Sequence, residues 1–324
     1  MKRLRNALVV LTALCAFAPA AAQQFPARPV RIVVGFAAGG PTDVIARIIA
    51  QDMSASLGQS FVVDNRPGAN AIIATELVAN ATPDGYTTLF SSLSLLVNAI
   101  LLENKLKYHP FKDFAPVSNA AVLPMVVVAS PAAPFNTLPE LLAAAKAKPG
   151  ALNYGTPGHG GSAHLAGALL ETLSGTKMTN IPFRGNAPAL AEVMSGRVNF
   201  MFYPIIGIAD LVAAKRLKVL AVGTAKRHPD FPDVPTMAES GFPGFEETAP
   251  WVGMLAPAGT PPAAVNLLSA EMRKSLAKPE TQARVKALGA VIVGDTPAEF
   301  LKFLRKDHDR WARVIKAAGV KAEE

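Results

Sequence analysis

Residues 29–43 read Pro29-Val30-Arg31-Ile32-Val33-Val34-Gly35-Phe36-Ala37-Ala38-Gly39-Gly40-Pro41-Thr42-Asp43, and this stretch decides the fold. The β-branched run from Val30 to Val34 predicts a buried strand, and the apolar residues of 42–56 recur at helical spacing. A glycine-rich loop joins the two, and Gly58 closes the helix. Strand, glycine-rich loop and amphipathic helix in this order are the first half of a βαβ unit, which predicts an open α/β sheet.

The same alternation of strands and helices continues along most of the chain. Further strands are predicted at 61–63, 87–90, 125–129, 153–155, 178–181, 198–202, 218–222, 251–255 and 291–293, and helices at 138–148, 162–174, 187–195, 205–214, 262–276 and 297–318. Strands that alternate with helices indicate parallel sheets covered on both faces. We therefore expect doubly wound α/β architecture.

The length of the chain predicts two domains. About 300 residues would remain after removal of an export signal, which is more than one hydrophobic core usually serves. We expect residues 23–125 together with 250–324 to form the first domain and residues 126–249 to form the second, with the strands at 125 and 251 crossing between them. The ligand cleft would lie between the domains, and the C-terminal helices would return to cover the first.

The N-terminus has the pattern of an export signal. Three basic residues precede an uncharged apolar run over 7–18, and Ala20-Ala21-Ala22 follows. The apolar run is too short to span a bilayer. We therefore predict that residues 1–22 are cleaved and that the mature protein is soluble in the periplasm. A retained N-terminal anchor is the alternative.

Cysteine usage and charge exclude several classes of protein. Cys15 is the only cysteine and lies inside the predicted signal, so the mature chain can form neither a disulfide nor a thiolate metal site. The formal net charge of +8 falls to about +5 without the signal, an excess that suits an anionic ligand or serves solubility. Lys and Arg are scattered, without the basic runs that nucleic-acid binding requires, so no nucleic acid is expected.

Two glycine-rich loops each join the C-terminal end of a strand to the N-terminal end of a helix. The first is 35–43, and the second reads Gly155-Thr156-Pro157-Gly158-His159-Gly160-Gly161-Ser162-Ala163-His164. Ligands of open α/β sheets bind at this edge, and the N–H groups at a helix N-terminus favour a negative group. One loop from each domain predicts a pair of opposed cradles for a small organic anion such as a carboxylate.

Several residues of these segments also have a purely structural interpretation. The glycines can simply form tight turns, and Thr42 and Ser162 can be plain helix N-caps. Asp43, in the first helical turn, either complements the helix dipole or receives an amino group of the ligand. Tyr203, at the end of a predicted strand, is expected in the cleft wall, where it could stack on an aromatic ligand or bond a carboxylate.

Sequence motifs for catalysis are incomplete. Gly158-His159-Gly160 lacks the spacing of a dinucleotide fingerprint, and Ser162 lacks the closing glycine of a nucleophile elbow. His159 and His164 are five positions apart with no third ligand nearby, so neither a metal site nor a cofactor is expected. We predict a binding protein and no enzyme. A hydrolase that uses Ser162 or His159 on a small acid is the alternative.

Six motifs together carry a family resemblance. They are Pro29 to Val34 with Gly39-Gly40 and Thr42-Asp43, Asn65-Arg66-Pro67-Gly68-Ala69, Pro83-Asp84-Gly85-Tyr86-Thr87, and the segments 108–114, 233–241 and 251–261. In these motifs the chain resembles the Bug family, the solute receptors of tripartite tricarboxylate transporters, over nearly all of the mature length. The resemblance implies a type II periplasmic-binding-protein fold, in which two doubly wound α/β domains joined by a two-strand hinge close around the ligand.

The resemblance also implies the site and the partners. Ligand contacts, many through backbone N–H groups, would fall on Phe36, Ala38, Gly39, Gly40, Thr42, Asp43, Ser92, Thr156, Gly158, His159, Gly160, Ser162 and His164, and we add Tyr203. A monomer would deliver a small carboxylate to the membrane permease subunits of a tripartite tricarboxylate transporter. A ligand-presenting adaptor for a periplasmic sensor is the alternative.

The chain departs from the family pattern at three places. The first loop commonly begins Pro-Phe and has a third glycine, where this chain has Gly35-Phe36 and Pro41. A strand that usually ends in Phe-Asp ends here in Phe202-Tyr203, and we expect the loss of that carboxylate to alter which ligand is accepted. The glycine-rich ending of the Asn-Arg-Pro-Gly motif is replaced by Asn70-Ala71, which we interpret as a backbone adjustment with little bearing on the ligand.

Overall fold

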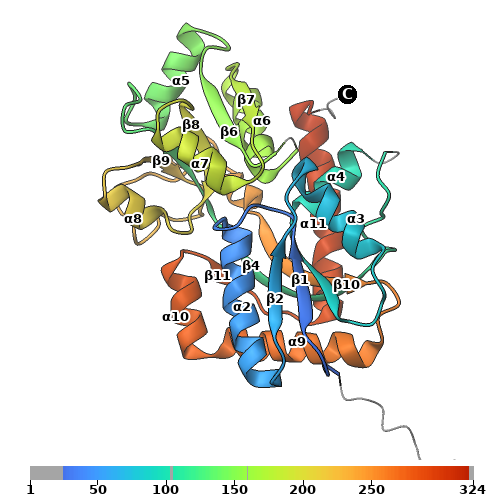
Figure 1. Cartoon of the computed structure of the whole chain (residues 1–324). Coiled ribbons are helices and arrows are strands. Elements are labelled where there is room, and N and C mark those ends of the chain that lie inside the picture. The colour runs from blue at the N-terminus through green and yellow to red at the C-terminus, as the bar shows by residue number, and fades with distance from the viewer. Residues whose placement is uncertain (1–24, 103–104, 159, 321–324) are drawn as a thin grey trace, which may run out of the picture.

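The computed structural model describes residues 25–102, 105–158 and 160–320, and it contains two β-sheets flanked by helices (Figure 1). Strands from both ends of the described chain form the first sheet, and strands from its middle form the second. We call the part built on each sheet a lobe. The predicted export signal, residues 1–22, lies outside the described residues.

The first sheet has six strands in the order β11-β4-β10-β3-β1-β2. Their bounds are β1 Val30–Val34, β2 Phe61–Asn65, β3 Thr87–Ser92, β4 Phe114–Val122, β10 Trp251–Pro257 and β11 Val291–Ile292. Strand β1 pairs in parallel with β2 and β3, so the carboxyl ends of these three strands meet at one edge. Strand β10 runs antiparallel to both β3 and β4.

The second sheet has five strands in the order β7-β6-β8-β5-β9. Their bounds are β5 Met125–Ala129, β6 Asn153–Thr156, β7 Thr179–Pro182, β8 Phe200–Pro204 and β9 Lys218–Val222. Strand β5 is antiparallel to β8 and β9, whereas β6 is parallel to β7 and β8. Both sheets are therefore mixed where the sequence pattern predicted parallel ones. Strands β5 and β10 are the first strands after the chain changes sheet. Each of them runs antiparallel to both of its neighbours.

The helices cover both sheets. They are α2 Pro41–Leu57, α3 Ile72–Ala79, α4 Ser94–Leu101, α5 Leu138–Ala147, α6 Ser162–Ser174, α7 Asn186–Met194, α8 Ile208–Ala213, α9 Pro262–Ala277, α10 Pro279–Ala287 and α11 Pro297–Ala318. The sequence pattern did not predict α3, α4, α10 or strand β4. Among the described residues, none of the helices combines the length and apolar character that a bilayer span needs.

The chain passes between the sheets at two neighbouring points. Strand β4 gives way to β5 at Leu123-Pro124, and Pro250 directly precedes β10 on the return. The Leu123 N–H donates to the Pro250 carbonyl at 2.8 Å, so the two passages lie side by side. The division into domains at residues 125 and 250 stays a prediction, although the sheets do exchange the chain close to both positions.

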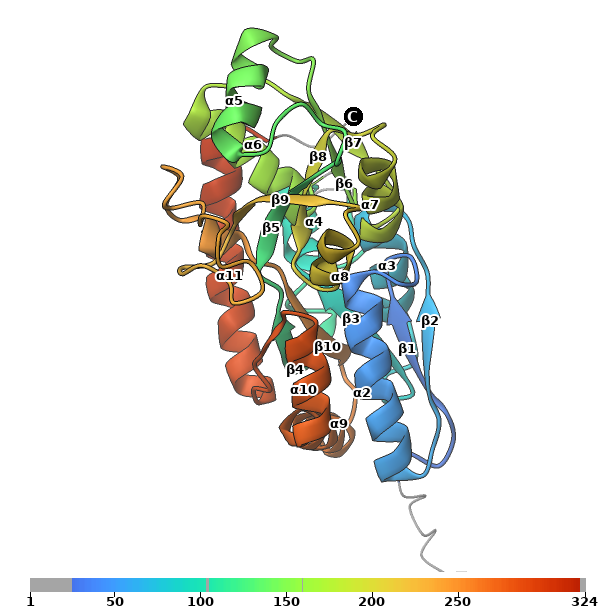
Figure 2. The ribbon, with the colours of Figure 1, turned by 90° about the vertical axis from the view of Figure 1, so that its left-hand side faces the viewer.

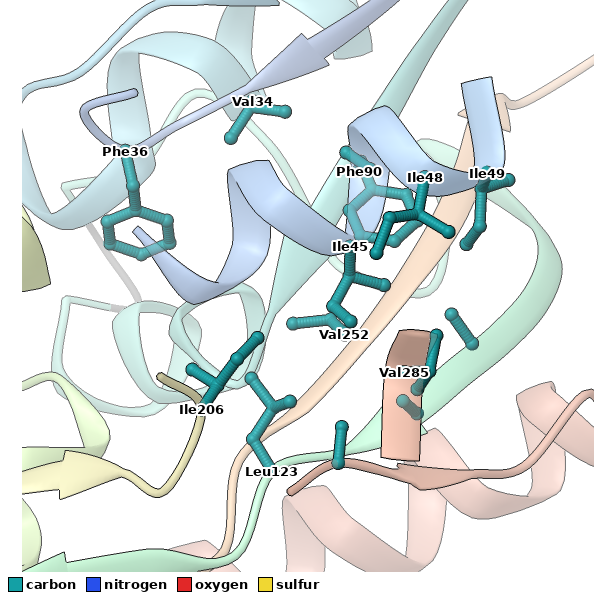
Figure 3. Packing of buried hydrophobic residues seen from close by; sticks show 14 of the residues in the cluster. Val34, Phe36, Ile45, Ile48, Ile49, Phe90, Leu123, Ile206, Val252 and Val285 are labelled. Carbon is teal, nitrogen blue, oxygen red and sulfur yellow. The ribbon is translucent and has the colours of Figure 1, made fainter. Parts of the chain in front are cut away.

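Helix α2 lies in the largest hydrophobic core. Its Ile45, Ile48 and Ile49 pack among side chains that include Phe90 and Val252 of the first sheet (Figure 3). Burial of each such isoleucine stabilises the fold by about 1.5–3 kcal/mol. Because this apolar face is fixed against the sheet, the N-terminus of α2 is held at the edge where β1, β2 and β3 end.

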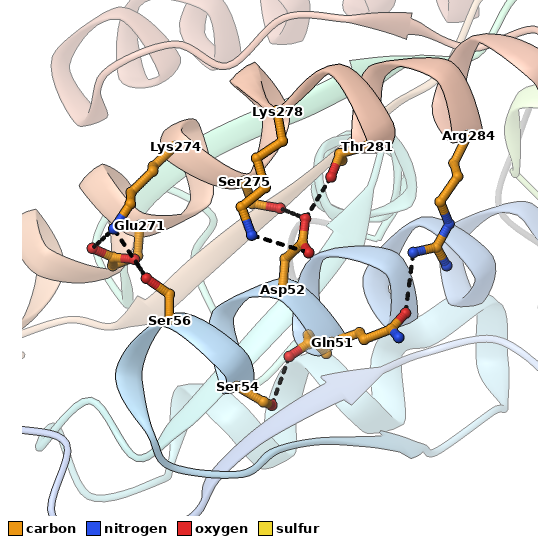
Figure 4. A network of polar contacts seen from close by, with 11 residues as sticks. Gln51, Asp52, Ser54, Ser56, Glu271, Lys274, Ser275, Lys278, Thr281 and Arg284 are labelled. Atoms are coloured by element: carbon orange, nitrogen blue, oxygen red, sulfur yellow. Dashed lines mark hydrogen bonds and ion pairs between the residues drawn. The ribbon is translucent and has the colours of Figure 1, made fainter.

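A polar network fixes the C-terminal half of α2 to the C-terminal helices (Figure 4). Asp52 accepts hydrogen bonds from Ser275 Oγ at 2.8 Å and Lys278 Nζ at 3.2 Å, and also from Thr281 Oγ1. Burial alone would raise the pKa of Asp52, but these hydrogen bonds and the Lys278 charge lower it overall. The network therefore ties α2 to α9 and α10 through an ionised carboxylate.

Helix α11 runs along both lobes (Figure 2). Phe300 and Leu304 pack in a core of the first lobe. Farther along the helix, Trp311 and Ile315 pack with Leu165 of α6 in the second lobe. The helix therefore joins the two lobes on one side of the molecule.

Candidate functional site

The two glycine-rich loops end in the same way. In each, a glycine with positive φ, Gly39 at 79° and Gly160 at 71°, precedes a glycine that caps the following helix. The Gly39 N–H donates to Asp43 Oδ2 at 2.9 Å, and the Gly160 N–H donates to His164 Nδ1 at 3.0 Å. Asp43 and His164 are the third residues of α2 and α6. Each side chain therefore closes its own loop, and the two helix N-termini are held in matching conformations.

Asp43 is engaged from several sides. Arg47 Nε donates to both of its oxygens, at 3.1 and 3.0 Å, and Asn65 Nδ2 donates to Oδ1 at 2.9 Å. Burial alone would raise the pKa of Asp43, but the hydrogen bonds from Arg47, Gly39 and Asn65 lower it overall. This arrangement supports the structural interpretation of Asp43, in which the carboxylate stabilises the loop and the helix N-terminus.

A small cavity of about 20 Å³ lies between the two helix N-termini. Four hydroxyl-bearing residues, Thr42, Ser92, Ser94 and Ser162, line it together with Asn186, and Ser92 Oγ lies 3.3 Å from Ser94 Oγ. No ionisable side chain is among its described lining residues. The wall therefore presents hydroxyl groups and the N-terminal ends of α2 and α6, which attract an anion.

A larger cavity of about 370 Å³ adjoins the small one, and the two share Phe36, Asn70 and Pro157 in their walls. The rest of the wall is mainly apolar, with Leu101 and Phe183 among the larger members. Asn98 and Arg184 are its other polar members, and Arg184, which is exposed, is the one ionisable side chain among the described lining residues. This cavity suits an apolar body beside a polar group.

Loops of the two lobes meet across these cavities. A Cβ atom added to Gly158 would lie 3.1 Å from Asn70 Cβ, and one added to Gly185 would lie 3.2 Å from the backbone nitrogen of Ala37. Both glycines have positive φ and no side chain, which lets the second lobe approach the first closely. The lobes are therefore in contact around the cavities, which lie between them.

Five of the predicted ligand-binding residues line these cavities: Phe36, Thr42, Ser92, Gly158 and Ser162. Others belong to the loops that hold the cavity walls in place. Gly40 caps α2, while Ala38 and Gly39 are exposed on the first loop. Asp43, Gly160 and His164 form the loop-closing hydrogen bonds already described.

The remaining predicted residues lie deeper or outside the description. Thr156 is fully buried, and its Oγ1 donates to Asn180 Oδ1 at 2.8 Å. Tyr203 is 4% exposed in the hydrophobic core, and burial raises its pKa above the usual range. His159 lies outside the described residues. Within the part of the chain that is described, no group of three or more metal-ligating side chains gathers. Ligand contact by Thr156, Tyr203 or His159 stays a prediction.

Sequence reasoning missed several cavity residues. Asn70 and Asn98 come from two segments of the first lobe. In the second lobe, Asn186 is the first residue of α7 and Arg184 lies in the loop just before it. The fold brings them together from distant positions, so no local spacing connects them. For Asn70 a signal existed, because the chain departs there from the family pattern.

Two of the places where the chain departs from the family pattern, Gly35 and Asn70-Ala71, form one structural feature. A Cβ atom added at Gly35 would lie 2.3 Å from Ala71 Cβ and 2.9 Å from Ala71 Cα. Gly35 is not among the glycines with positive φ, so space and not backbone conformation requires a glycine there. Ala71 itself has a φ of 71° and follows Asn70 at 48°. The absence of a side chain at Gly35 is what makes room for the Asn70-Ala71 turn.

Known proteins match this chain along most of its length. The family model of the tripartite tricarboxylate transporter family receptor matches residues 45–320. The chain belongs to this receptor family. The structure of the periplasmic binding protein BugD is similar, with a TM-score of 0.87 and 36% identity over 92% of this chain and 100% of BugD. Bug-family membership and the periplasmic-binding-protein fold are thereby confirmed.

Two proteins of Rhodopseudomonas palustris have similar structures and were solved with ligands. One, with adipate, has a TM-score of 0.88 and 34% identity over 92% of this chain and 99% of its own. The other, MatC with malate, has a TM-score of 0.85 and 33% identity over 90% of this chain and 100% of its own. Relatives in this family are thus periplasmic solute-binding proteins, and these two hold small carboxylates.

Proposed function

We propose that this chain is a periplasmic receptor that traps a small carboxylate between its lobes and delivers it to the permease subunits of a tripartite tricarboxylate-type transporter. The observation that carries the proposal is the small cavity, which is lined by two helix N-termini and by four serine and threonine residues. Its described wall holds no acid that would repel an anion. The adipate and malate bound by two relatives support a carboxylate as the ligand.

The sizes of the two cavities indicate how such a ligand would lie. The small cavity, about 20 Å³, holds about one water molecule, so the lobes must part slightly around a carboxylate at its mouth. The body of the ligand would then occupy the adjoining cavity of about 370 Å³, a usual size for a small-molecule site. Arg184, at the exposed side of that cavity, would attract a second negative group.

Entry of the ligand requires the closed lobes to separate. The two passages of the chain, at Leu123-Pro124 and at Pro250, lie side by side and suit a hinge. A ligand that touches both lobes only in the closed state shifts the population toward that state. The closed surface is then what the permease would recognise, and the signal at 1–22 would place the receptor in the periplasm.

Calorimetry on the purified mature protein tests the proposal, after a thermal-shift screen of mono- and dicarboxylates. A native-state ligand at a hundred times its Kd adds about 2.7 kcal/mol of stability. Ser162→Ala should lower the affinity of the best carboxylate about tenfold, because a hydrogen bond to a charged group is lost. Ser174→Ala is the matched control, since Ser174 Oγ donates to the Leu170 carbonyl at the far end of α6.

Three outcomes have separate meanings. Binding without turnover, weakened only in Ser162→Ala, supports the receptor. Conversion of the bound acid, lost in Ser162→Ala, would instead establish the hydrolase alternative. If no carboxylate binds to a ligand-free sample of the protein, the proposed receptor function is refuted. Uptake of the bound acid by cells with and without the gene then separates delivery to a permease from presentation to a sensor.

A further inference from the structure

Asn70 lies in a backbone conformation that few side chains adopt. It is the middle of three consecutive non-glycine residues with positive φ, at 47° for Ala69, 48° for Asn70 and 71° for Ala71. Left-handed conformations are unfavourable for L-residues, and asparagine is among the few that tolerate them. The turn also forms part of the walls of both cavities. Such strain beside a binding site points to a use for the side chain that it places there.

Asn98 determines which way the Asn70 carboxamide points. Asn98 is 2% exposed, and its Nδ2 donates to the backbone carbonyl of Asn70 at 2.9 Å. A carbonyl oxygen only accepts, so the amide nitrogen of Asn98 must face it and Asn98 Oδ1 must face the Asn70 side chain. There Asn98 Oδ1 accepts from Asn70 Nδ2 at 2.9 Å. The orientation of the Asn70 amide is therefore fixed, with Oδ1 directed away from Asn98.

Asn70 Oδ1 is a buried acceptor without a hydrogen-bond partner among the described atoms. It faces the second loop, where Cβ atoms added to Gly158 and Gly161 would lie 3.2 and 3.4 Å from it. Neither glycine has a side chain that could donate. Buried polar atoms are almost always paired in native proteins, so this oxygen marks a place for a donor. A carboxylate only accepts, so a ligand that pairs this oxygen must do so with another of its groups.

The surrounding charges favour a hydroxyl over an ammonium group as that donor. No Asp or Glu is among the described residues that line either cavity, and the Asp43 carboxylate is already engaged by Arg47. An ammonium group would be buried there without a counter-ion, whereas a hydroxyl group is neutral. We propose that Asn70 is a specificity-determining residue whose Oδ1 accepts a hydrogen bond from a hydroxyl group, and that the preferred ligand is a hydroxycarboxylate. This inference rests on the proposed receptor function and deepens it.

Calorimetry with matched pairs of acids tests the inference on the mature protein. Malate and succinate, lactate and propanoate, and 3-phenyllactate and 3-phenylpropanoate each differ by one hydroxyl group. The wild type should bind the hydroxyl member of the best pair at least about tenfold tighter, because a site built around a hydroxyl group rejects the analogue without it. In Asn70→Gly, which also relieves the positive φ, this preference should fall to about twofold or less.

Two further variants serve as a second test of Asn70 and as a control. Asn70→Ala also removes the acceptor and should lose the same preference if the glycine variant does not fold. Asn80→Gly is the matched control, because Asn80 is exposed at the end of α3 and its Nδ2 donates to the Glu76 carbonyl. Equal affinity for both members of every pair would overturn the inference and leave the receptor function standing. A preference retained in both Asn70 variants would overturn it too. Failure to bind any carboxylate would remove the receptor function itself.

Discussion

A methyl group added at Gly35 would test whether the first loop and the start of α3 pack as one unit. Gly35→Ala places a Cβ atom 2.3 Å from Ala71 Cβ, 2.9 Å from Ala71 Cα and 3.3 Å from Ala74 Cβ. A Cβ atom has no rotamer, so the overlap can be relieved only by a shift of the backbone. We expect a loss of about 2–3 kcal/mol in the free energy of unfolding, the upper part of the range for overpacked cores.

Ala71→Gly completes a double-mutant cycle. It removes the contact at 2.3 Å but leaves the one with Cα at 2.9 Å, and it relieves the φ of 71°. Relief of a left-handed alanine is worth about 1 kcal/mol and opposes the added freedom of glycine in the unfolded chain. Ala71→Gly alone should therefore change stability by less than about 1 kcal/mol. In that background Gly35→Ala should cost about 1 kcal/mol, a coupling of about 1–2 kcal/mol.

Unfolding of the four proteins in urea measures this coupling, provided that the m-values agree. Gly40→Ala is the matched control, because Gly40 belongs to the same loop, has a φ of −79° and would place its Cβ no closer than 3.4 Å to its nearest neighbour. Its cost should be equal in both backgrounds. If the cost of Gly35→Ala is also equal within about 0.5 kcal/mol, the two positions are independent and the reasoning is refuted.

Three further predictions concern acidic residues. Burial raises the pKa of Asp295 to about 6 from 3.8, so the folded state binds its proton more tightly, and stability should fall by about 1 kcal/mol from pH 4 to pH 7. Urea unfolding across this range should show the slope in the wild type and a flatter one in Asp295→Asn. Asp52→Ala leaves the buried Ser275 and Thr281 hydroxyls without their acceptor, so the free energy of unfolding should fall by about 1–3 kcal/mol. The ligand affinity of this variant, measured by calorimetry, should equal that of the wild type. Asp43→Ala releases the first loop and should weaken carboxylate binding about tenfold, equal to one charge-assisted hydrogen bond. Unchanged affinity in that variant would show that the first loop does not hold the ligand.

The bounds of the elements with the clearest hydrophobic pattern were predicted to the residue. Strands β1 and β5 and helices α6 and α11 have the predicted bounds. Strand β4 was missed because it carries Ser118 and Asn119 in its buried interior, which hides the apolar pattern. Ser118 is tolerated there because its Oγ donates to the backbone carbonyl of Asp295 at 2.7 Å, and Asp295 Oδ1 also accepts the backbone N–H of Asn119 at 2.7 Å. That partner lies in a distant part of the chain, and no local pattern reveals it.

The two glycine-rich loops of the candidate site were predictable from the sequence, whereas several residues that line its cavities were not. Glycines at strand-to-helix junctions identified both loops, because the dipole argument needs only local sequence. Asn98 and Asn186 line the cavities because the fold packs together segments that are remote in the chain. Asn70 was visible as a departure and was interpreted as a backbone adjustment. The structure shows that its side chain also forms part of both cavity walls.

The lining of the small cavity, which has no ionisable side chain among its described residues, bears on how fast a ligand of the proposed receptor would leave. Dipoles and hydroxyl groups act over short range, so dissolved salt should screen them little and should barely change the equilibrium. An anion held in this way leaves without breaking an ion pair. In the proposed receptor its departure is then governed by the separation of the lobes, and the residence time of the ligand becomes a property of the proposed hinge.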